Sequence, residues 1–123
     1  MIDLTRYKTL IFVFHMPDCP ACEEYLPTFQ EVAKVYERCI PTLVDRGGRI
    51  HATGNAQAAV LILNAVDERF TKHADHFRIS ETPTTVVLFR TRHDQNFQMA
   101  GVLDAGETNR LFVRAMHGLS CEI

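Results

Sequence analysis

Apolar residues occur along the chain in short continuous runs that alternate with stretches of helical spacing. Residues 10–14 and 58–63 are nearly all apolar, as expected of central strands covered on both faces of a sheet. Residues 84–89, which follow Thr82 and Pro83, favour a third strand. A turn at residues 92–95 then leads to a fourth strand at about residues 97–102.

Three stretches have the periodicity of helices. A helix is predicted from Pro20 onward, with Pro27 expected to kink it, and a short one over residues 67–77. A third, capped by Asp104 and ending at Gly118, closes the chain. The first and third predictions depend on the apolar positions Tyr25, Phe29, Val32, Ala33 and Tyr36, and Leu111, Phe112, Ala115, Met116 and Leu119.

Residues 38–56 show no regular pattern, because proline, glycine and asparagine interrupt them, and at most one short element is expected there. The first two strands, joined through a helix, should be parallel, and the last two, joined by a tight turn, antiparallel. The pattern therefore predicts an α/β fold in which a four-stranded mixed sheet has about three helices on its two faces. A single domain is expected to span residues 1–123.

The composition narrows the classes of function. A net charge of −2, without a basic stripe, gives no reason to expect nucleic acid or an anionic membrane as a partner. The apolar run at residues 10–14 is too short for a signal peptide or a membrane span. We therefore expect a monomeric cytoplasmic protein in which persistent structural disulfides do not form.

Cys19 and Cys22 lie three residues apart where the first helix begins, so their side chains share one face. Pro20 suits the first turn of a helix. At the cap, the sulfur of Cys19 would lie near free N–H groups and the positive end of the helix dipole, which stabilise a reactive thiolate. The pair therefore indicates redox chemistry. The alternative is a zinc half-site, but zinc needs four ligands, and Cys39 and Cys121 are isolated in the sequence.

In this cysteine pair and in the order of its predicted elements, most of the chain resembles the thioredoxin superfamily. The resemblance implies that the Thr82–Pro83 bond is cis and faces the cysteines. It also implies that Thr82, Pro83, Pro20 and Ala21 form the substrate-binding surface, with the Thr82 backbone bonded to an extended substrate segment. The matching features are the strand before Cys-Pro-Ala-Cys, Pro27, Leu63-Asn64, Thr82-Pro83-Thr84 and Gly101-Val102-Leu103, in the family's order.

Several positions depart from the thioredoxin pattern. Pro20 is the glutaredoxin residue after the first cysteine, whereas Ala21 is typical of neither subgroup. Val13 aligns with the buried acid of many thioredoxins, His15 replaces an aromatic residue, and Asp18 precedes Cys19. The Gly-Gly pair of glutathione-binding glutaredoxins is missing near the last helix. The subgroup therefore stays open.

These observations predict a thiol–disulfide oxidoreductase that reduces or exchanges protein disulfides, with Cys19 as nucleophile and Cys22 as resolving thiol. Protonated His15 should lower the pKa of Cys19, and ionised Asp18 should raise it. No metal and no cofactor beyond the Cys19–Cys22 disulfide is expected, and the electron donor is an upstream thiol reductase or glutathione. The alternatives are a glutathione-linked glutaredoxin-like protein and a non-catalytic binding module that uses the groove at Pro83.

Two histidines and two further cysteines could in principle carry chemistry, but no functional role is expected of them. His73 and His76 have a spacing that allows metal binding, but they are expected to be surface residues of a polar helical face. Cys39 and Cys121 are expected to be free thiols without a role, with regulation as the alternative.

Overall fold

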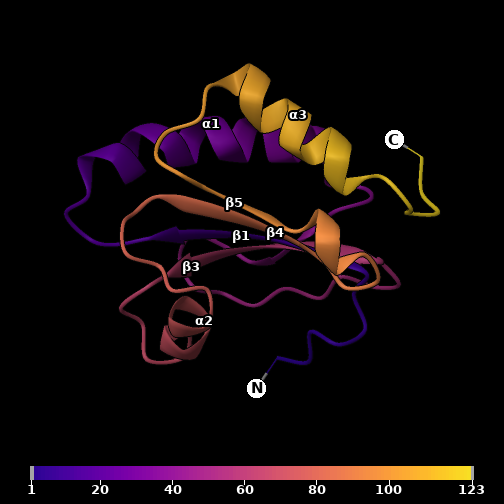
Figure 1. The fold of residues 1–123 in the computed structure, drawn as a ribbon, viewed down its shortest axis with the longest axis horizontal. Coiled ribbons are helices and arrows are strands. Elements are labelled where there is room, and N and C mark those ends of the chain that lie inside the picture. Colours follow the sequence, from indigo (N-terminus) through magenta and orange to yellow (C-terminus); the bar gives the residue numbers. More distant parts are fainter. Residues whose placement is uncertain (1, 123) are drawn as a thin grey trace.

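The structure, a computed structural model, describes residues 2–122 as five strands in one mixed sheet with helices on both faces (Figure 1). The order of the strands across the sheet is β2-β3-β1-β4-β5. The elements are β1 (Thr9–His15), α1 (Pro20–Tyr36), β2 (Thr42–Val44), β3 (Ala58–Asn64), α2 (Thr71–His76), β4 (Thr84–Phe89), a 3₁₀ turn (His93–Gln95), β5 (Phe97–Ala100) and α3 (Ala105–Ala115).

The central strand β1 determines where the rest of the sheet lies. It pairs in parallel with β3, from Thr9 opposite Ala58 to His15 opposite Asn64, and antiparallel with β4 on its other side. All seven residues of β1 are buried, as a strand covered on both faces requires. The predicted parallel pairing of the first two strands (β1 with β3) and the predicted antiparallel pairing of the last two (β4 with β5) are confirmed.

The predicted number of strands was wrong by one. Strand β2 lies within residues 38–56, and Thr42 pairs with Val60 of β3. A strand of three residues is too short to show alternation, which explains why the sequence pattern did not predict it. Strand β5 also ends at Ala100, two residues earlier than expected, because Gly101 adopts a φ of +94° and turns the chain.

Helices α1 and α3 cover one face of the sheet (Figure 1). Tyr36 stacks on Phe112, with ring centroids 5.0 Å apart, and Phe29 packs on the same ring at 5.4 Å. Asp104 caps α3 as predicted, since it accepts a hydrogen bond from the N–H of Glu107, whose side chain bonds back. Within residues 2–122 no helix combines the length and the apolar character needed to cross a membrane.

The opposite face of the sheet is covered by α2, which is shorter than predicted (Figure 1). The helix begins at Thr71 rather than residue 67 because residues 67–70 form a turn. In that turn the carboxylate of Asp67 accepts a hydrogen bond from the N–H of Arg69 at 2.9 Å, and the Asp67 carbonyl accepts one from the N–H of Phe70 at 2.8 Å. One short helix therefore leaves part of this face to be covered by the N-terminal residues.

Cys39 and Cys121 form a disulfide, which contradicts the expectation that they are free thiols. Their Cα atoms lie 5.8 Å apart although 82 residues separate them in the sequence. Cys39 follows the end of α1 and is buried, and Cys121 lies in the tail after α3. The sequence could not reveal this pairing, because it depends on α1 and α3 running in roughly the same direction on one face of the sheet, which brings their two C-terminal ends together (Figure 1). All four cysteines of the described residues are therefore paired.

Candidate active site

Strand β1 and helix α1 place Cys19 at the N-terminus of the helix. Asp18 has a φ of +55° and completes the turn out of the strand. Cys19 is the N-cap residue, and its Sγ accepts a hydrogen bond from the N–H of Cys22 at 3.2 Å. Pro20 occupies the first turn, where a missing N–H costs nothing. The N–H group and the helix dipole both favour negative charge on this sulfur.

Cys19 and Cys22 are bonded to each other, with Cα atoms 5.2 Å apart. The two sulfurs differ in accessibility: Cys19 is partly exposed, whereas Cys22 is only 1% exposed. A substrate can therefore approach Cys19 but not Cys22. This asymmetry suits an attacking thiol and a resolving thiol, respectively.

The segment at Thr82 and Pro83 lies against Cys19. The hydroxyl of Thr82 donates a hydrogen bond to Cys19 Sγ at 3.5 Å, and the Thr82 carbonyl oxygen lies 3.6 Å from the same sulfur. The Thr82–Pro83 peptide bond is cis, and the Pro83 carbonyl accepts a hydrogen bond from the N–H of Gly101 at 2.8 Å. The structure thus brings together Cys19 and Thr82, which are 63 residues apart.

Three other site residues predicted from the sequence, Asp18, Pro20 and Ala21, are the neighbours of Cys19 in the chain. Pro20 is exposed and Ala21 is partly exposed, so both are available at the surface beside Cys19. Asp18 is exposed and makes no side-chain hydrogen bond or ion pair with any residue from 2 to 122. Their contacts with a substrate stay a prediction.

The burial of His15 works against the protonated form that the sequence interpretation invoked. The side chain is 9% exposed, and its Nε2 has no hydrogen-bond partner within the described chain. Burial lowers the pKa of His15 below its ordinary value, with a smaller contribution from the Arg46 guanidinium. This shift favours the neutral imidazole, which has no positive charge with which to lower the pKa of Cys19.

An ion pair next to this histidine was not predicted. Arg46, in the loop after β2, lies 2.7 Å from the carboxylate of Glu23 in the first turn of α1. The two charges act in opposite directions on the pKa of His15. No sequence signal links the loop to the helix, so this contact could be found only in three dimensions. As a partly exposed pair it contributes roughly 0–1 kcal/mol to stability.

His73 is also more enclosed than expected. It lies between aromatic rings, with its ring centroid 6.1 Å from that of Phe12 and 6.4 Å from that of Phe70, and its buried Nδ1 has no hydrogen-bond partner among residues 2–122. The prediction that it is a surface residue was therefore wrong, whereas His76 is exposed. Within residues 2–122 no group of three or more histidine, cysteine or acidic side chains is placed to hold a metal ion.

These two histidines predict a loss of stability in mild acid. Burial lowers the pKa of both His15 and His73, so below about pH 6.5 the unfolded chain binds protons that the folded chain does not. The unfolding free energy should fall as the pH decreases from about 6.5 towards the folded pKa values. Each histidine contributes a slope of at most about 1.4 kcal/mol per pH unit.

Urea denaturation at pH 7.5, 6.5 and 5.5 measures this slope. The variant His15→Gln/His73→Gln should show a flatter dependence than the wild type. His93→Gln/His117→Gln removes two exposed histidines and is the matched control. An equal slope in the wild type and the first variant would show that these two groups do not cause the effect.

Comparison with solved structures identifies the fold. A chloroplastic thioredoxin z superposes with a TM-score of 0.63 at 18% identity, over 93% of this chain and 83% of the other. An uncharacterised thioredoxin-like protein from Clostridium perfringens gives a TM-score of 0.64 at 15% identity, over 94% and 76%. A mutant thioredoxin from Halobacterium salinarum gives 0.59 at 14% identity, over 91% and 79%. No family model and no curated protein matches the sequence.

The chain therefore has the thioredoxin fold, as the sequence predicted. Identities this low show the fold alone. The particular features of this molecule are a Cys-Pro-Ala-Cys pair at the start of α1, a contact between Thr82 and Cys19, and a second disulfide far from the first in sequence.

Proposed function

We propose that this protein is a thiol–disulfide oxidoreductase that reduces or exchanges protein disulfides through Cys19 and Cys22. The observation that carries the proposal is the asymmetric pair at the N-terminus of α1. Cys19 is partly exposed and accepts a hydrogen bond from a backbone N–H, while Cys22 is bonded to it from a buried position. A site built only to bind a partner has no need of such a pair.

In the reducing direction, the thiolate of Cys19 attacks one sulfur of a substrate disulfide. The substrate S–S bond breaks, a mixed disulfide with Cys19 forms, and the released substrate sulfur takes up a proton. Cys22 then loses its proton and attacks Cys19 Sγ, which releases the second substrate thiol. Two electrons have passed from the dithiol to the substrate, and Cys19–Cys22 is oxidised.

The N-terminus of α1 is the group that favours the thiolate in this proposal. The hydrogen bond from the N–H of Cys22 and the hydroxyl of Thr82 both reach Cys19 Sγ. Hydrogen bonds to the charged form lower the pKa of a thiol. Since His15 is neutral near pH 7, it adds no positive charge. Water, His15 and Asp18 are the predicted acceptors of the Cys22 proton.

The Thr82–Pro83 segment is the proposed docking surface for the substrate chain. Its contact with Cys19 means that an extended segment bonded to the backbone of Thr82 passes directly over the reactive sulfur. Pro20 and Ala21 line the other side. The partners are disulfide-containing proteins and an upstream thiol reductase or glutathione, and we propose that the protein acts as a monomer.

Cytoplasmic location stays a prediction, but the consequence drawn from it, that structural disulfides do not form, disagrees with the bond between Cys39 and Cys121. Such disulfides persist mainly in oxidising compartments. Trapping free thiols with an alkylating reagent in intact cells would show whether this pair is oxidised where the protein works.

Reduction of insulin by dithiothreitol tests the proposed activity. The wild-type protein should shorten the time before the reduced insulin B chain precipitates, because Cys19 and Cys22 offer a faster path for the electrons than dithiothreitol alone. An unchanged time course would favour the alternative, a thioredoxin-fold module that binds a partner without catalysis. Lysozyme, which carries no Cys-x-x-Cys helix start of this kind, serves as a protein control.

A further inference from the structure

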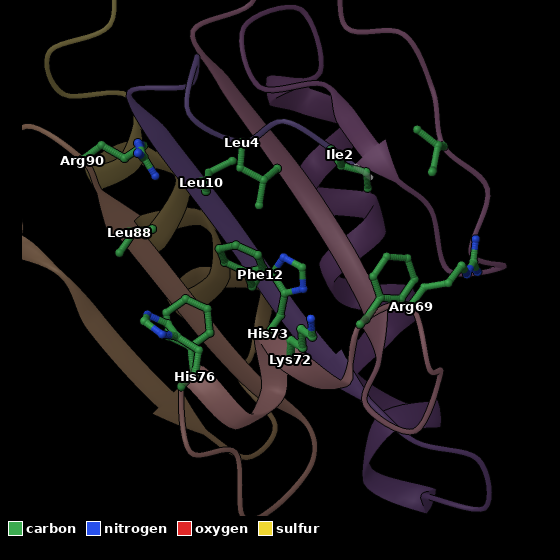
Figure 2. A pocket seen from close by; sticks show the side chains of 13 residues that line it. Ile2, Leu4, Leu10, Phe12, Arg69, Lys72, His73, His76, Leu88 and Arg90 are labelled. Carbon is green, nitrogen blue, oxygen red and sulfur yellow. The ribbon is translucent and has the colours of Figure 1, made fainter.

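A cavity lies on the face of the sheet that α2 covers, away from Cys19. It has a volume of about 500 Å³, which falls within the range of about 300–1,000 Å³ for small-molecule sites (Figure 2). Leu10 and Phe12 of β1 and Leu88 of β4 contribute from the sheet, and Ile2 and Leu4 come from the N-terminal segment. None of the residues that line it belongs to the proposed redox site.

The inner surface of this cavity is apolar. Leu10 and Phe12 are 0% and 1% exposed, so the sheet forms a closed floor. Phe70 and Phe77 form the wall on the side of α2, and the Phe77 ring packs on Phe12 with centroids 5.1 Å apart. Such a surface favours a hydrocarbon chain or ring over water.

The ionisable side chains around the cavity are all basic residue types. Arg69, Lys72, His73, His76 and Arg90 line it, and no aspartate or glutamate does. Figure 2 shows them arranged around the apolar residues, with Arg90 and Lys72 on different sides. A ligand that matches both the apolar inner surface and the basic side chains around it therefore has an apolar body and a negative charge.

These basic residues are not equivalent. Arg69 is already bonded to the carboxylate of Asp67 at 2.8 Å and to the Gly48 carbonyl at 3.0 Å, so its charge is compensated. Lys72 and Arg90 form no ion pair with a residue from 2 to 122. The charge of Arg90 contributes to lowering the pKa of Asp3, but the Asp3 carboxylate is hydrogen-bonded to Thr5 and not to Arg90. Lys72 and Arg90 are therefore available to bind an anion.

His73 lies between the apolar inner surface of the cavity and the basic residues around it. Figure 2 shows its imidazole beside the ring of Phe12. Burial lowers its pKa, and the neighbouring His76 lowers it further, so it is neutral near pH 7 and extends the apolar wall. The positive charge at the mouth then comes from Lys72 and Arg90.

We propose that this cavity binds a small amphipathic carboxylate, with its hydrocarbon part against the partly exposed Leu4, Phe77 and Leu88 and its carboxylate at Lys72 or Arg90. Apolar burial supplies affinity, and the two cations select a carboxylate over a neutral or cationic compound of the same length. This inference does not depend on the redox chemistry of Cys19.

Isothermal titration of the full chain with octanoate, 1-octanol and octylammonium tests the proposal. Octanoate should bind saturably, octanol at least about tenfold more weakly because it lacks the ionic contact, and octylammonium without measurable heat. The variant Lys72→Gln/Arg90→Gln should lose about the same tenfold for octanoate and bind octanol unchanged. Amide shifts in nuclear magnetic resonance should change at Phe12, His73 and Leu88 and not along α1.

Two further variants complete the experiment. Leu88→Trp fills the cavity from β4 and should abolish binding of octanoate. Lys34→Gln/Arg110→Gln removes two positive charges from exposed positions on α1 and α3 and is the matched control, which should bind like the wild type. Circular dichroism confirms that each variant is folded.

Three results would overturn the proposal. They are the absence of saturable octanoate binding, equal binding of octanoate and octanol, and an equal loss of affinity in the control variant. A dimer in light scattering that Leu88→Trp dissociates would also overturn it, because a second copy would then occupy the cavity.

Discussion

Replacing Cys19 by serine should abolish insulin reduction, whereas replacing Cys22 by serine should stop the reaction at a covalent complex between Cys19 and the substrate. Cys19 is the only one of the two sulfurs that a substrate can reach, so without it no mixed disulfide forms. Without Cys22 the mixed disulfide forms but nothing inside the protein displaces it. Cys19→Ser should leave only the rate of dithiothreitol alone, and Cys22→Ser should turn over only as fast as dithiothreitol releases its mixed disulfide.

The covalent complex can be measured directly. Mass spectrometry under non-reducing conditions should detect Cys22→Ser bound to a substrate chain, and the adduct should disappear when dithiothreitol is added. Cys19→Ser should give no adduct. Cys39→Ser/Cys121→Ser is the control, because it removes the other two cysteines and should retain activity below its melting temperature. An active Cys19→Ser variant would contradict the proposed mechanism.

The same variant separates the two subgroups that the sequence left open. If glutathione is the physiological reductant, Cys22→Ser should still reduce a mixed disulfide between glutathione and a small thiol, since one thiol suffices for that reaction. If the protein uses both thiols on protein substrates, the activity should disappear. Assays with glutathione and its reductase measure which of these holds.

Removing the disulfide between Cys39 and Cys121 should cost about 4 to 5 kcal/mol of unfolding free energy. The bond joins residues separated by 82 positions, and in the chain-entropy account the stabilisation grows with the length of the loop that is closed. For a domain of this size, that loss corresponds to a decrease in melting temperature of about 15 °C. The effect acts mainly through the unfolded chain.

Guanidinium denaturation of Cys39→Ala/Cys121→Ala against the oxidised wild type measures this loss. Cys19→Ala/Cys22→Ala is the matched control, since its loop closes over a sequence separation of only 3 and should therefore contribute much less. Each single variant leaves one free thiol and should be as unstable as the double variant. Equal stability of the double variant and the wild type would show that the bond does not form in solution.

The sequence predicted the fold well where its signals are local. Continuous apolar runs located β1 and β3 within one residue of their ends, and the residues after Pro83 defined β4. Asp104 and Glu107 formed the expected cap of α3. Strand β2 was missed, because three residues give no period. Helix α2 was predicted too long, since the turn at Asp67 is held by side-chain contacts that the spacing of Phe70 and Phe77 does not reveal.

The candidate site also has features that the sequence predicts and features that only the three-dimensional structure shows. The pairing of Cys19 with Cys22 could be predicted from the Cys-Pro-Ala-Cys motif. The position of Thr82 beside them could be predicted from the order of the motifs along the chain. The charge of His15 could not, because it depends on how far the end of β1 is buried and on Arg46 from a distant loop. The pairing of Cys39 with Cys121 depends on where two helices end in space, and the cavity beneath α2 depends on how little of the sheet that helix covers.

Helix α1 carries a cysteine pair at each of its ends. Cys19 begins it, and Cys39 follows its last turn, where the N–H groups of Cys39 and Ile40 donate to the Tyr36 carbonyl. The far end is thus anchored to the C-terminal tail by a covalent bond. In the proposed redox cycle the Cys19–Cys22 bond opens and closes at the N-terminus of α1, while the disulfide between Cys39 and Cys121 continues to hold the other end of the helix. The proposed reaction at the N-terminus of α1 would therefore take place on a helix whose C-terminal end is covalently fixed.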